Sequence, residues 1–594
     1  MNDRSDGGVS WHALIRAMVL AIALCAMFPA IAKVAAANVA YRVEIDAPAP
    51  LAGLLKAHLD LVRFEQRTDL GKEQFDYLLA TVGEQVSQLA ATEGYFSPVT
   101  HARVEKVGAL QVVHIEVSPG ERTRVSDVLL RFTGPIATQE PGRVATLESK
   151  WGMPVGQPFR QDDWSKAKDD TLYALQRYRY HAARLTFSQA RIEPDRHRAE
   201  LDAEYDSGPA FTLGKLHVTG TRRYPASIVE HVNPLHEGEP YSVDRLLELQ
   251  RQIQNTPYFS NVIIDVPSDP AQASLAPVNV KVTEFPTQRV QAGVGYASDT
   301  GAHVLGRYGY NNVFGRAWVF SSQANLEQQR QYGLVSLAMP PDAKAYVNSV
   351  STSFNRTTVE GVDQRSLQIG LKRARTLDKY DWAYTLDFYR DELRPDTGPR
   401  FLNHALVPGF AWTRRNVDDP IFPRRGNIIS TQIGFGVKGM LSDQSFGRVY
   451  GRIRQYVPIG QRDLMILRTE FGAVLTHGSN DRIPASLLFR AGGNDSIRGY
   501  GYQSIGLNQD GSVLPAKYLA TGSIEYQHWL SHQWGGAIFW DLGTASDTLQ
   551  GAKIYNGVGF GVRWRSPVGP VNLDLGYGIE RHQFRPNISL GVAF

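Results

Sequence analysis

The sequence predicts three small α/β modules followed by an all-β transmembrane barrel of 16 antiparallel strands. Three observations favour this architecture: a repeated helix, turn and strand pattern in the first half, a change to period-two alternation near residue 287, and an apolar N-terminal segment typical of secretion signals. The expected boundaries are a signal peptide at 1–37, modules at 38–119, 120–207 and 208–285, and the barrel at 286–594.

The charge balance of the chain gives no support for nucleic-acid binding. The 594 residues contain 63 Lys and Arg against 59 Asp and Glu, for a net charge of +4, and no basic stripe is evident. Hydrophobic residues make up 43% of the chain, too few for a bundle of membrane helices. A nucleic-acid partner is therefore not expected, whereas a lipid bilayer is.

The N-terminus has the three parts of a signal peptide. Arg4 and Arg16 supply positive charge, residues 17–32 form an apolar run, and small residues favour cleavage after Ala37. A membrane anchor is the alternative. It is disfavoured because the run is short and Pro29 interrupts it.

The only cysteine, Cys25, lies inside this segment. Leu24 precedes it, whereas a lipoprotein site requires a small residue there. The mature chain therefore lacks the thiols needed for a disulfide, a cysteine nucleophile or a cysteine metal site. We expect neither a metal nor a cofactor.

The first half repeats one unit three times at a spacing of roughly eighty residues. Each unit has a helical stretch with apolar residues three and four apart, an aromatic turn, and two strand-like runs. The turns read "EGYFSPV" (93–99), "QRYRYHAARL" (176–185) and "TPYFSNVII" (256–264). Three unrelated α+β domains are the alternative, and the repeated order of elements disfavours it.

The second half alternates apolar and polar residues with period two. In "IISTQIGFGV" (428–437) and "LRTEFGAVL" (467–475), one face is mainly apolar and the other small or polar. A soluble β-sandwich produces the same alternation. The signal peptide and the alternating lengths of the connectors favour the barrel, although the segment at 414–427 is long where a short turn is expected.

The strand count is sixteen if residues 485–492 belong to a loop and seventeen if they form a strand. Bacterial barrels of this kind have an even number of strands, which favours sixteen. The segment 476–517 then follows the eleventh strand and forms the sixth external loop.

This loop contains "SIRGYGYQSIG" (496–506), in which Arg498 stands among glycines and tyrosines. Alternation places Glu525 and Asp541 on the lumen faces of later strands, so a loop folded into the lumen brings Arg498 within reach of carboxylates. The alternative is a solvated loop arginine above ordinary lumen polarity, and alternation alone does not decide between the two.

Three motifs resemble those of the outer-membrane insertase superfamily, which includes BamA and TamA: "IRGY" (497–500), "FWDLG" (539–543) and "GVGFGVRWRSPVGPVNLDLGYG" (557–578). The repeated modules resemble polypeptide-transport-associated (POTRA) domains. The resemblance implies a lumen loop motif of Arg498, Gly499 and Tyr500. It also implies that the wall partners of this loop are Asp541, Phe539 and Glu525. The strand signature consists of Gly559, Gly561 and Arg563, and Arg563 receives no separate role.

The three modules, "AGGNDSIRGYGYQSIG" (491–506) and "DDPIFPRRG" (418–426) are similar to TamA-type members. This resemblance implies an outer-membrane protein with periplasmic POTRA domains. Its implied function is the insertion of autotransporters and other nascent barrel proteins through a lateral seam, with a TamB-like inner-membrane partner. The alternative is a transport pore for a polypeptide or for phospholipid.

The final strand, "NISLGVAF" (587–594), ends on Phe594, which predicts an insertion signal of the kind that barrel proteins carry. Gly591 either lets this strand kink at the seam or fits lumen packing, and the two interpretations are equally weighted. An enzyme is not expected, because the sequence shows no GxSxG, P-loop or HExxH motif.

Overall fold

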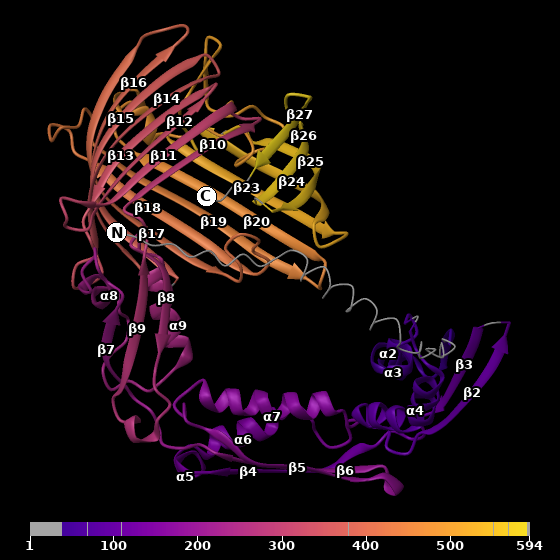
Figure 1. The fold of residues 1–594 in the computed structure, drawn as a ribbon. Coiled ribbons are helices and arrows are strands. Elements are labelled where there is room, and N and C mark those ends of the chain that lie inside the picture. Colours follow the sequence, from indigo (N-terminus) through magenta and orange to yellow (C-terminus); the bar gives the residue numbers. More distant parts are fainter. Residues whose placement is uncertain are drawn as a thin grey trace, which may run out of the picture. The chain divides into compact units, whose positions relative to one another are not determined.

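The computed structural model describes residues 39–590 except 68, 109, 378, 551 and 568. The expected signal peptide, and Gly591 and Phe594, lie outside the described residues. The chain forms two compact units: the first contains the first two modules, and the second contains the third module and the barrel (Figure 1). Within the described residues, no helix is both long and apolar enough to cross a membrane.

The first unit contains two modules of the same β-α-β-β plan. The elements of the first module are β1 (Tyr41–Asp46), α2 (Ala49–His58), α3 (Asp60–Arg63), α4 (Lys72–Thr92), β2 (Val99–Val107) and β3 (Leu110–Ser118). Those of the second are β4 (Arg124–Thr133), α5 (Pro135–Gln139), α6 (Pro141–Ser149), α7 (Gln161–Gln176), β5 (Arg184–Glu193) and β6 (Arg198–Asp206). In each sheet the last strand lies between the other two and pairs in parallel with the first, in the orders β1-β3-β2 and β4-β6-β5.

The third module, in the second unit, repeats this plan. Its elements are β7 (Leu213–Thr219), α8 (Ser227–His231), α9 (Val243–Gln254), β8 (Phe259–Asp265) and β9 (Ala276–Glu284), with sheet order β7-β9-β8. The three-part repeat expected from the aromatic turns is therefore present as three POTRA-like modules.

The core of the first module shows why this pattern folds. The helix α4 buries residues three and four apart, and β3 buries every second residue, so one stripe of the helix covers one face of the sheet. The buried residues of these two elements are Phe75, Leu78, Val82, Val86, Ala90, Val113, Ile115 and Val117.

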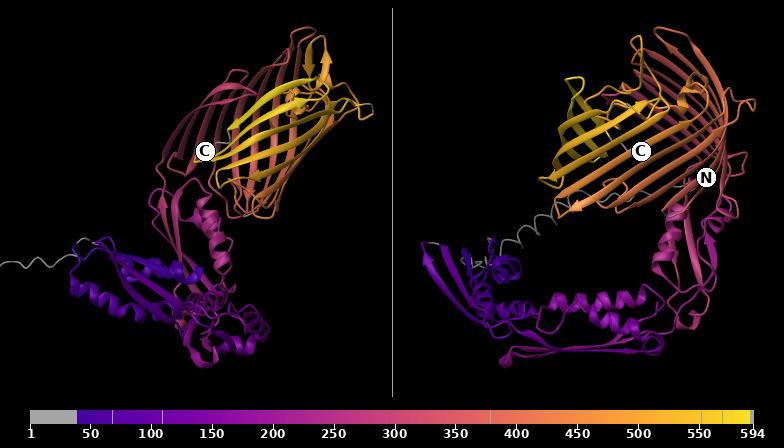
Figure 2. Two further views of the ribbon diagram at one scale, coloured as in Figure 1. Left: turned by 90° about the vertical axis from the view of Figure 1, so that its right-hand side faces the viewer. Right: turned by 180° about the vertical axis from the view of Figure 1, so that it is seen from behind.

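The barrel is one antiparallel sheet of 16 strands, which confirms the expected fold (Figures 1 and 2). Its strands are, in order, β10 (Gln288–Ala297), β11 (Gly301–Val313), β12 (Trp318–Glu327), β13 (Arg330–Ala338), β14 (Val347–Val359), β15 (Val362–Thr376), β16 (Tyr380–Pro395), β17 (Phe401–Val417), β18 (Gly426–Gly436), β19 (Phe446–Ile459), β20 (Asp463–Leu475), β23 (Tyr518–Trp529), β24 (Trp534–Ser546), β25 (Tyr555–Ser566), β26 (Gly569–Gly578) and β27 (Gln583–Leu590). Each strand pairs with its sequence neighbour in this series.

Alternation along the strands separates a lipid face from a lumen face. On β24, Ile538 and Trp540 are 61% and 47% exposed on the outside, whereas Phe539 and Asp541 are 5% and 0% exposed. Because a single sheet curls into a barrel, the exposed apolar face is the outer surface and is not buried against a second sheet. The β-sandwich alternative is thereby excluded.

The long segment 476–517 connects β20, the eleventh strand of the barrel, to β23. Residues 485–492 contribute no strand to the barrel, which accounts for sixteen strands and not seventeen. The segment carries only a short hairpin of its own, β21 (Leu507–Gln509) and β22 (Ser512–Leu514).

The third module is fixed to the turns at one end of the barrel. The Tyr258 hydroxyl donates to the carbonyl of Ala317 at 2.7 Å, and the Asn311 amide donates to the carbonyl of Pro257 at 2.8 Å. Tyr258 is buried, so this contact is shielded from water. The module therefore marks the barrel end from which β10 starts.

Glu284, at the end of β9, closes a loop of the third module. Its Oε1 accepts hydrogen bonds from the backbone N–H groups of Arg222, Arg223 and Tyr224 at 2.7, 2.7 and 3.2 Å. Burial alone raises the pKa of Glu284, but the three donors outweigh it and hold the pKa below its usual 4.5. The ionised carboxylate therefore stabilises the loop.

We expect Glu284→Gln to raise the hydrogen-exchange rate of amides 222–224 on the order of tenfold at pH 7, because charge-assisted hydrogen bonds are lost. The folded pKa is lowered, so this stabilisation is present above pH 4.5 and disappears as the pH falls through the folded value. Protection factors should thus converge below pH 4.5. An equal effect of the substitution at pH 3 and pH 7 would contradict the assigned role of the charge.

Candidate functional site

The loop between β20 and β23 folds into the barrel and packs against its wall. Ile497, Arg498 and Tyr500 are 0%, 3% and 1% exposed. The apolar members of the loop join a cluster with small and apolar wall residues such as Ala405, Val474 and Ala545. The loop thus buries enough apolar surface to hold a charged side chain inside the lumen.

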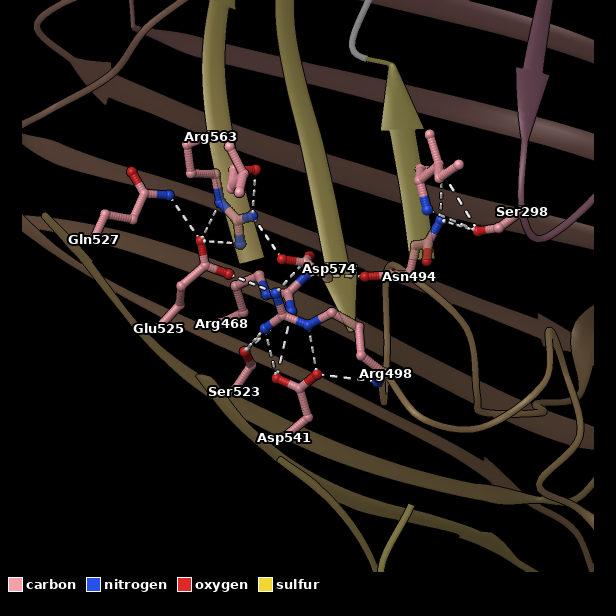
Figure 3. A network of polar contacts seen from close by, with 12 residues as sticks. Ser298, Arg468, Asn494, Arg498, Ser523, Glu525, Gln527, Asp541, Arg563 and Asp574 are labelled. Carbon is pink, nitrogen blue, oxygen red and sulfur yellow. Dashed lines mark hydrogen bonds and ion pairs between the residues drawn. The ribbon is translucent and has the colours of Figure 1, made fainter. Parts of the chain in front are cut away.

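Arg498 is bound on several sides (Figure 3). Its Nε and Nη2 donate to the two oxygens of Asp541 at 2.8 and 2.9 Å, and its backbone N–H adds a bond to Asp541 Oδ2 at 3.0 Å. Its Nη1 donates to Glu525 at 2.6 Å and to Asp574 at 3.2 Å. The guanidinium carbon lies 3.4 Å from the ring centroid of Phe539. This bidentate and stacked geometry requires arginine.

A second arginine completes the network from the wall. Arg563 Nε and Nη2 donate to Glu525 Oε1 at 3.0 and 2.8 Å, and Nη1 donates to Asp574 Oδ1 at 2.6 Å. Glu525 therefore bridges Arg563 to Arg498, and Asp574 bridges the same two arginines. The adjacent Gln527 amide donates to Glu525 at 2.7 Å.

The network balances its charges within the lumen. Arg468 Nη2 lies 3.6 Å from Asp541 Oδ1 and donates to Ser523 Oγ at 3.0 Å. Three arginines (Arg468, Arg498 and Arg563) therefore face three carboxylates (Glu525, Asp541 and Asp574). Removing one partner leaves a buried charge uncompensated, which costs more than the pair contributes.

Glycines let the loop backbone touch the wall. Gly499 has φ of 92°, a conformation that favours glycine, and a Cβ there would lie 2.7 Å from the backbone nitrogen of Gly578. On the wall, a Cβ at Gly576 would lie 2.6 Å from Gly499 N, and one at Gly559 would lie 2.4 Å from Phe539 Cζ. Gly561 is on β25 with Arg563 and faces Asp574 on β26, and a Cβ at Gly561 would clash with both side chains.

Tyr500 anchors the other side of the loop. Its hydroxyl donates to the carbonyl of Asn556 at 3.0 Å, is hydrogen bonded to Glu580, and accepts from the Glu580 backbone N–H at 3.1 Å. Its ring meets Tyr555 edge-on at 5.5 Å. The loop is therefore held at two points, Arg498 deep in the lumen and Tyr500 near the β25–β26 wall.

The same loop reaches the seam where the sheet meets itself. Over the described residues, β10 and β27 are the two ends of the sheet and share no ladder. Ile588 N–H donates to Ser298 Oγ at 3.0 Å, and the Asn494 amide donates to Ser298 Oγ at 3.2 Å and to Ile588 O at 3.1 Å. Asn494 N–H also donates to Asp299 Oδ2 at 2.9 Å. We call Asn494, Ser298, Asp299 and Ile588 the seam latch; Figure 3 shows the contact between Asn494 and Ser298.

A cavity of about 700 Å³ lies between the network and the seam. Its lining includes Glu525 and Arg563 of the network, Tyr296 and Asn587 beside the seam, and Phe422 of the 418–426 turn. The unexpectedly long segment at 414–427 is thus explained: it reaches the lumen cavity, as a short turn could not.

Several residues of the site were missed by sequence reasoning. Asp574 lies on a strand whose alternation, Val571, Leu573 and Leu575 against Asn572, Asp574 and Gly576, indicates an inward position. Ser298 and Asn494 carry no such signal, because their contact depends on how the two ends of the sheet are staggered. Among the described residues, no cluster of His, Cys, Asp or Glu is arranged to hold a metal ion.

Comparison with known protein families decides the identity of the barrel. Residues 312–594 match the Omp85 superfamily domain, and residues 211–284 match a POTRA domain described as a surface antigen variable number repeat. The barrel is an Omp85 superfamily domain. It lies in the Gram-negative outer membrane, with the POTRA modules in the periplasm. The barrel end that holds the third module is therefore periplasmic.

Sequence relatives of this chain include two proteins named outer membrane protein assembly factor BamA. That of Nitratidesulfovibrio vulgaris is 25% identical over 412 residues, covering 64% of this chain and 51% of the relative. That of Neisseria meningitidis serogroup B is 20% identical over 458 residues, covering 71% and 56%. The chain thus spans about half the length of the curated relatives that it matches.

A solved structure supports the fold of this chain. BamA from Haemophilus ducreyi lacking POTRA domains 1–3 aligns with a TM-score of 0.57 at 16% identity, covering 78% of this chain and 98% of that structure. At this identity the likeness establishes the architecture of modules followed by a barrel.

We expect Arg498→Ala to lower the free energy of unfolding by about 3–5 kcal/mol, because Asp541 and Glu525 would keep uncompensated charges. Urea unfolding of the detergent-solubilised protein, followed by tryptophan fluorescence, measures this. The matched control is Arg452→Ala, whose partner Asp495 is 85% exposed at the side chain, and which should change stability by less than about 1 kcal/mol. Equal effects of the two substitutions would refute the buried network.

A double-mutant cycle isolates the central pair. Asp541→Ala alone should destabilise the barrel as Arg498→Ala does, and the double variant should cost clearly less than the sum of the two, because neither partner is left alone. Additive losses would show that the two residues stabilise the barrel independently.

Proposed function

We propose that this protein inserts nascent β-barrel proteins, autotransporters among them, into the outer membrane through the seam between β10 and β27. The observation that carries the proposal is the seam itself. The described residues of these strands are joined by the Ser298–Ile588 contacts and the Asn494 amide, in place of a ladder.

A seam of this kind is costly in a lipid bilayer. Strand-edge N–H and C=O groups have no water to bind in the hydrocarbon region, so an unpaired edge favours any strand that can pair with it. A client strand supplies such a partner at low cost, because it exchanges few protein contacts for a full ladder. The cavity beside Tyr296 and Asn587 gives the polar face of that strand a place in the lumen.

The proposed TamA-like role rests on the three modules and on the loop and turn motifs at 491–506 and 418–426. In this role the periplasmic modules bind a TamB-like inner-membrane partner and receive clients along exposed strand edges. The relatives named BamA favour barrel assembly as the general activity, and a TamA-type division of labour is the more specific form of the proposal.

The rival function is a pore for a polypeptide or for phospholipid. Arg498 and Tyr500 are buried, so the loop occupies the lumen in this structure and a pore would have to expel it. Expulsion would break the network of three arginines and three carboxylates, whereas opening the seam breaks, among the described residues, the hydrogen bonds of the latch. Seam opening is therefore the less costly movement and supports insertion over transport.

A disulfide across the seam tests the proposal. Ser298 and Ile588 contact one another across the seam, with Ser298 N and Ile588 O 3.5 Å apart, so we place one cysteine at each position. The only native cysteine, Cys25, lies in the expected signal peptide. We expect Ser298→Cys with Ile588→Cys to reduce insertion of an unfolded barrel client into proteoliposomes to the spontaneous rate, and a reductant to restore it.

The matched control links two strands that are already paired. Ser321 and Ser336 face each other on β12 and β13 with their hydroxyls 2.8 Å apart. Cysteines there should form a disulfide and leave insertion unchanged. Full activity of the oxidised seam variant would overturn the proposal.

A further inference from the structure

The outer face of the barrel has a hollow of about 460 Å³ at the periplasmic ends of β12 to β16, which Figure 1 shows as neighbouring strands. Most of the lining side chains on the outer face are apolar, and two of the lining residues are aromatic. These lining residues are Trp318, Leu337, Val350, Leu371, Tyr384 and Leu386. The hollow faces the hydrocarbon of the periplasmic leaflet, so a lipid chain is the molecule that meets it.

The chemistry of the outer face changes in rows with depth. Leu337, Val350, Leu371 and Leu386 are paired in register across four strands and form an apolar row. The next row toward the periplasm pairs Asn348, Arg373 and Tyr384, and the row beyond pairs Arg375 with Trp382. Apolar, polar and cationic rows in this order match the acyl chain, glycerol region and phosphate of a phospholipid.

A cationic cluster beside the hollow is built around one ring. Arg373 lines the hollow, whereas Arg375 and Trp382 lie in the next row toward the periplasm, outside the lining. The guanidinium carbons of Arg373 and Arg375 lie 4.4 and 5.7 Å from the ring centroid of Tyr346. Trp382 Nε1 donates to the Tyr346 hydroxyl at 3.1 Å, which fixes the ring, and Arg375 also lies 5.7 Å from the Trp382 ring. Two arginines are thus held side by side at the level expected for headgroups.

The charge at this end is not balanced by the protein. Arg373 is already engaged, because it donates to Asp342 Oδ2 at 2.6 Å and to Asn348 Oδ1 at 3.0 Å. Arg375 has no ion pair or hydrogen bond within the described part of the chain, and its Nε is buried without a partner. Two positive charges and one negative charge leave one cation, which a phosphodiester neutralises.

We propose that this hollow, named here the Arg375 hollow, binds one anionic phospholipid of the periplasmic leaflet. The acyl chain lies over Val350 and Leu371, and the phosphate binds Arg375 beside the engaged Arg373. The inference depends on the outer-membrane location of the barrel and not on the proposed insertion activity. The site lies on the wall of β12 to β16, whereas the seam lies between β10 and β27.

Native mass spectrometry of the full chain tests the site. Protein is exchanged into detergent micelles containing equal mole fractions of phosphatidylglycerol and phosphatidylcholine, and bound lipids are counted. We expect one retained phosphatidylglycerol per chain, and about fivefold less retention by Arg375→Gln, the effect of one arginine at an anionic lipid surface. Val350→Trp fills the hollow and should lower retention of phosphatidylglycerol as well.

Matched controls lie on the same outer face away from the hollow. Arg414, opposite Tyr380 on β17, also has a buried Nε without a partner, and Arg414→Gln should retain lipid as the wild type does. Ile433→Trp on β18 controls for the added ring at an exposed position. Heat-modifiable migration on gels checks that each variant is folded.

Two results would overturn the proposal. The first is equal retention by Arg375→Gln and Arg414→Gln, which would mean nonspecific lipid around the barrel. The second is equal retention of phosphatidylglycerol and phosphatidylcholine by the wild type, which would mean that the hollow binds acyl chains without selectivity for the headgroup charge. Should Val350→Trp fail to fold, the comparison of phosphatidylglycerol retention between Arg375→Gln and Arg414→Gln still tests the proposal.

Discussion

Backbone pairing in lipid is the constraint on which the rest of this structure depends. Fifteen junctions between neighbouring strands satisfy it with ladders. In the described residues the sixteenth junction, between β10 and β27, consists of a few hydrogen bonds around Ser298, Ile588 and Asn494. Among the described residues, the strand edges without a ladder therefore lie along one line. The buried arginine network stiffens the wall beside that line, so the weak junction exists within an otherwise tightly held barrel.

The network, together with the buried apolar residues of the loop, explains how a long loop with a charged side chain can occupy the lumen. Arg498 alone would be prohibitively costly to bury, and three carboxylates alone would repel one another. Together with Arg468 and Arg563 they form a neutral set in which every guanidinium meets at least one carboxylate. The wall glycines serve the same end, because Gly576 and Gly559 leave room for the loop backbone and for Phe539.

Much of this arrangement could be predicted from the sequence because strands have a strict period of two. Alternation alone places Glu525 and Asp541 inside the barrel and Ile538 and Trp540 outside. The strand count places the loop of Arg498 after the eleventh strand, and connector parity places it on the external side. The same rule applied to β26 would have placed Asp574 inside. The seam latch could not be predicted, since Asn494 and Ser298 are 196 residues apart and meet only after the sheet has closed.

The loop carries Asn494 and Arg498 only four positions apart, one bonded to the seam and the other to wall residues on β24 and β26. Where the two attachments are coupled through this short segment, the coupling is reciprocal: the seam contact strengthens the wall contact by the same free energy as the wall contact strengthens the seam contact. The exposed hairpin of Gln509 and Asp510 belongs to the same segment. A molecule that binds this hairpin from outside the cell would thereby change the stability of the β10–β27 junction within the bilayer.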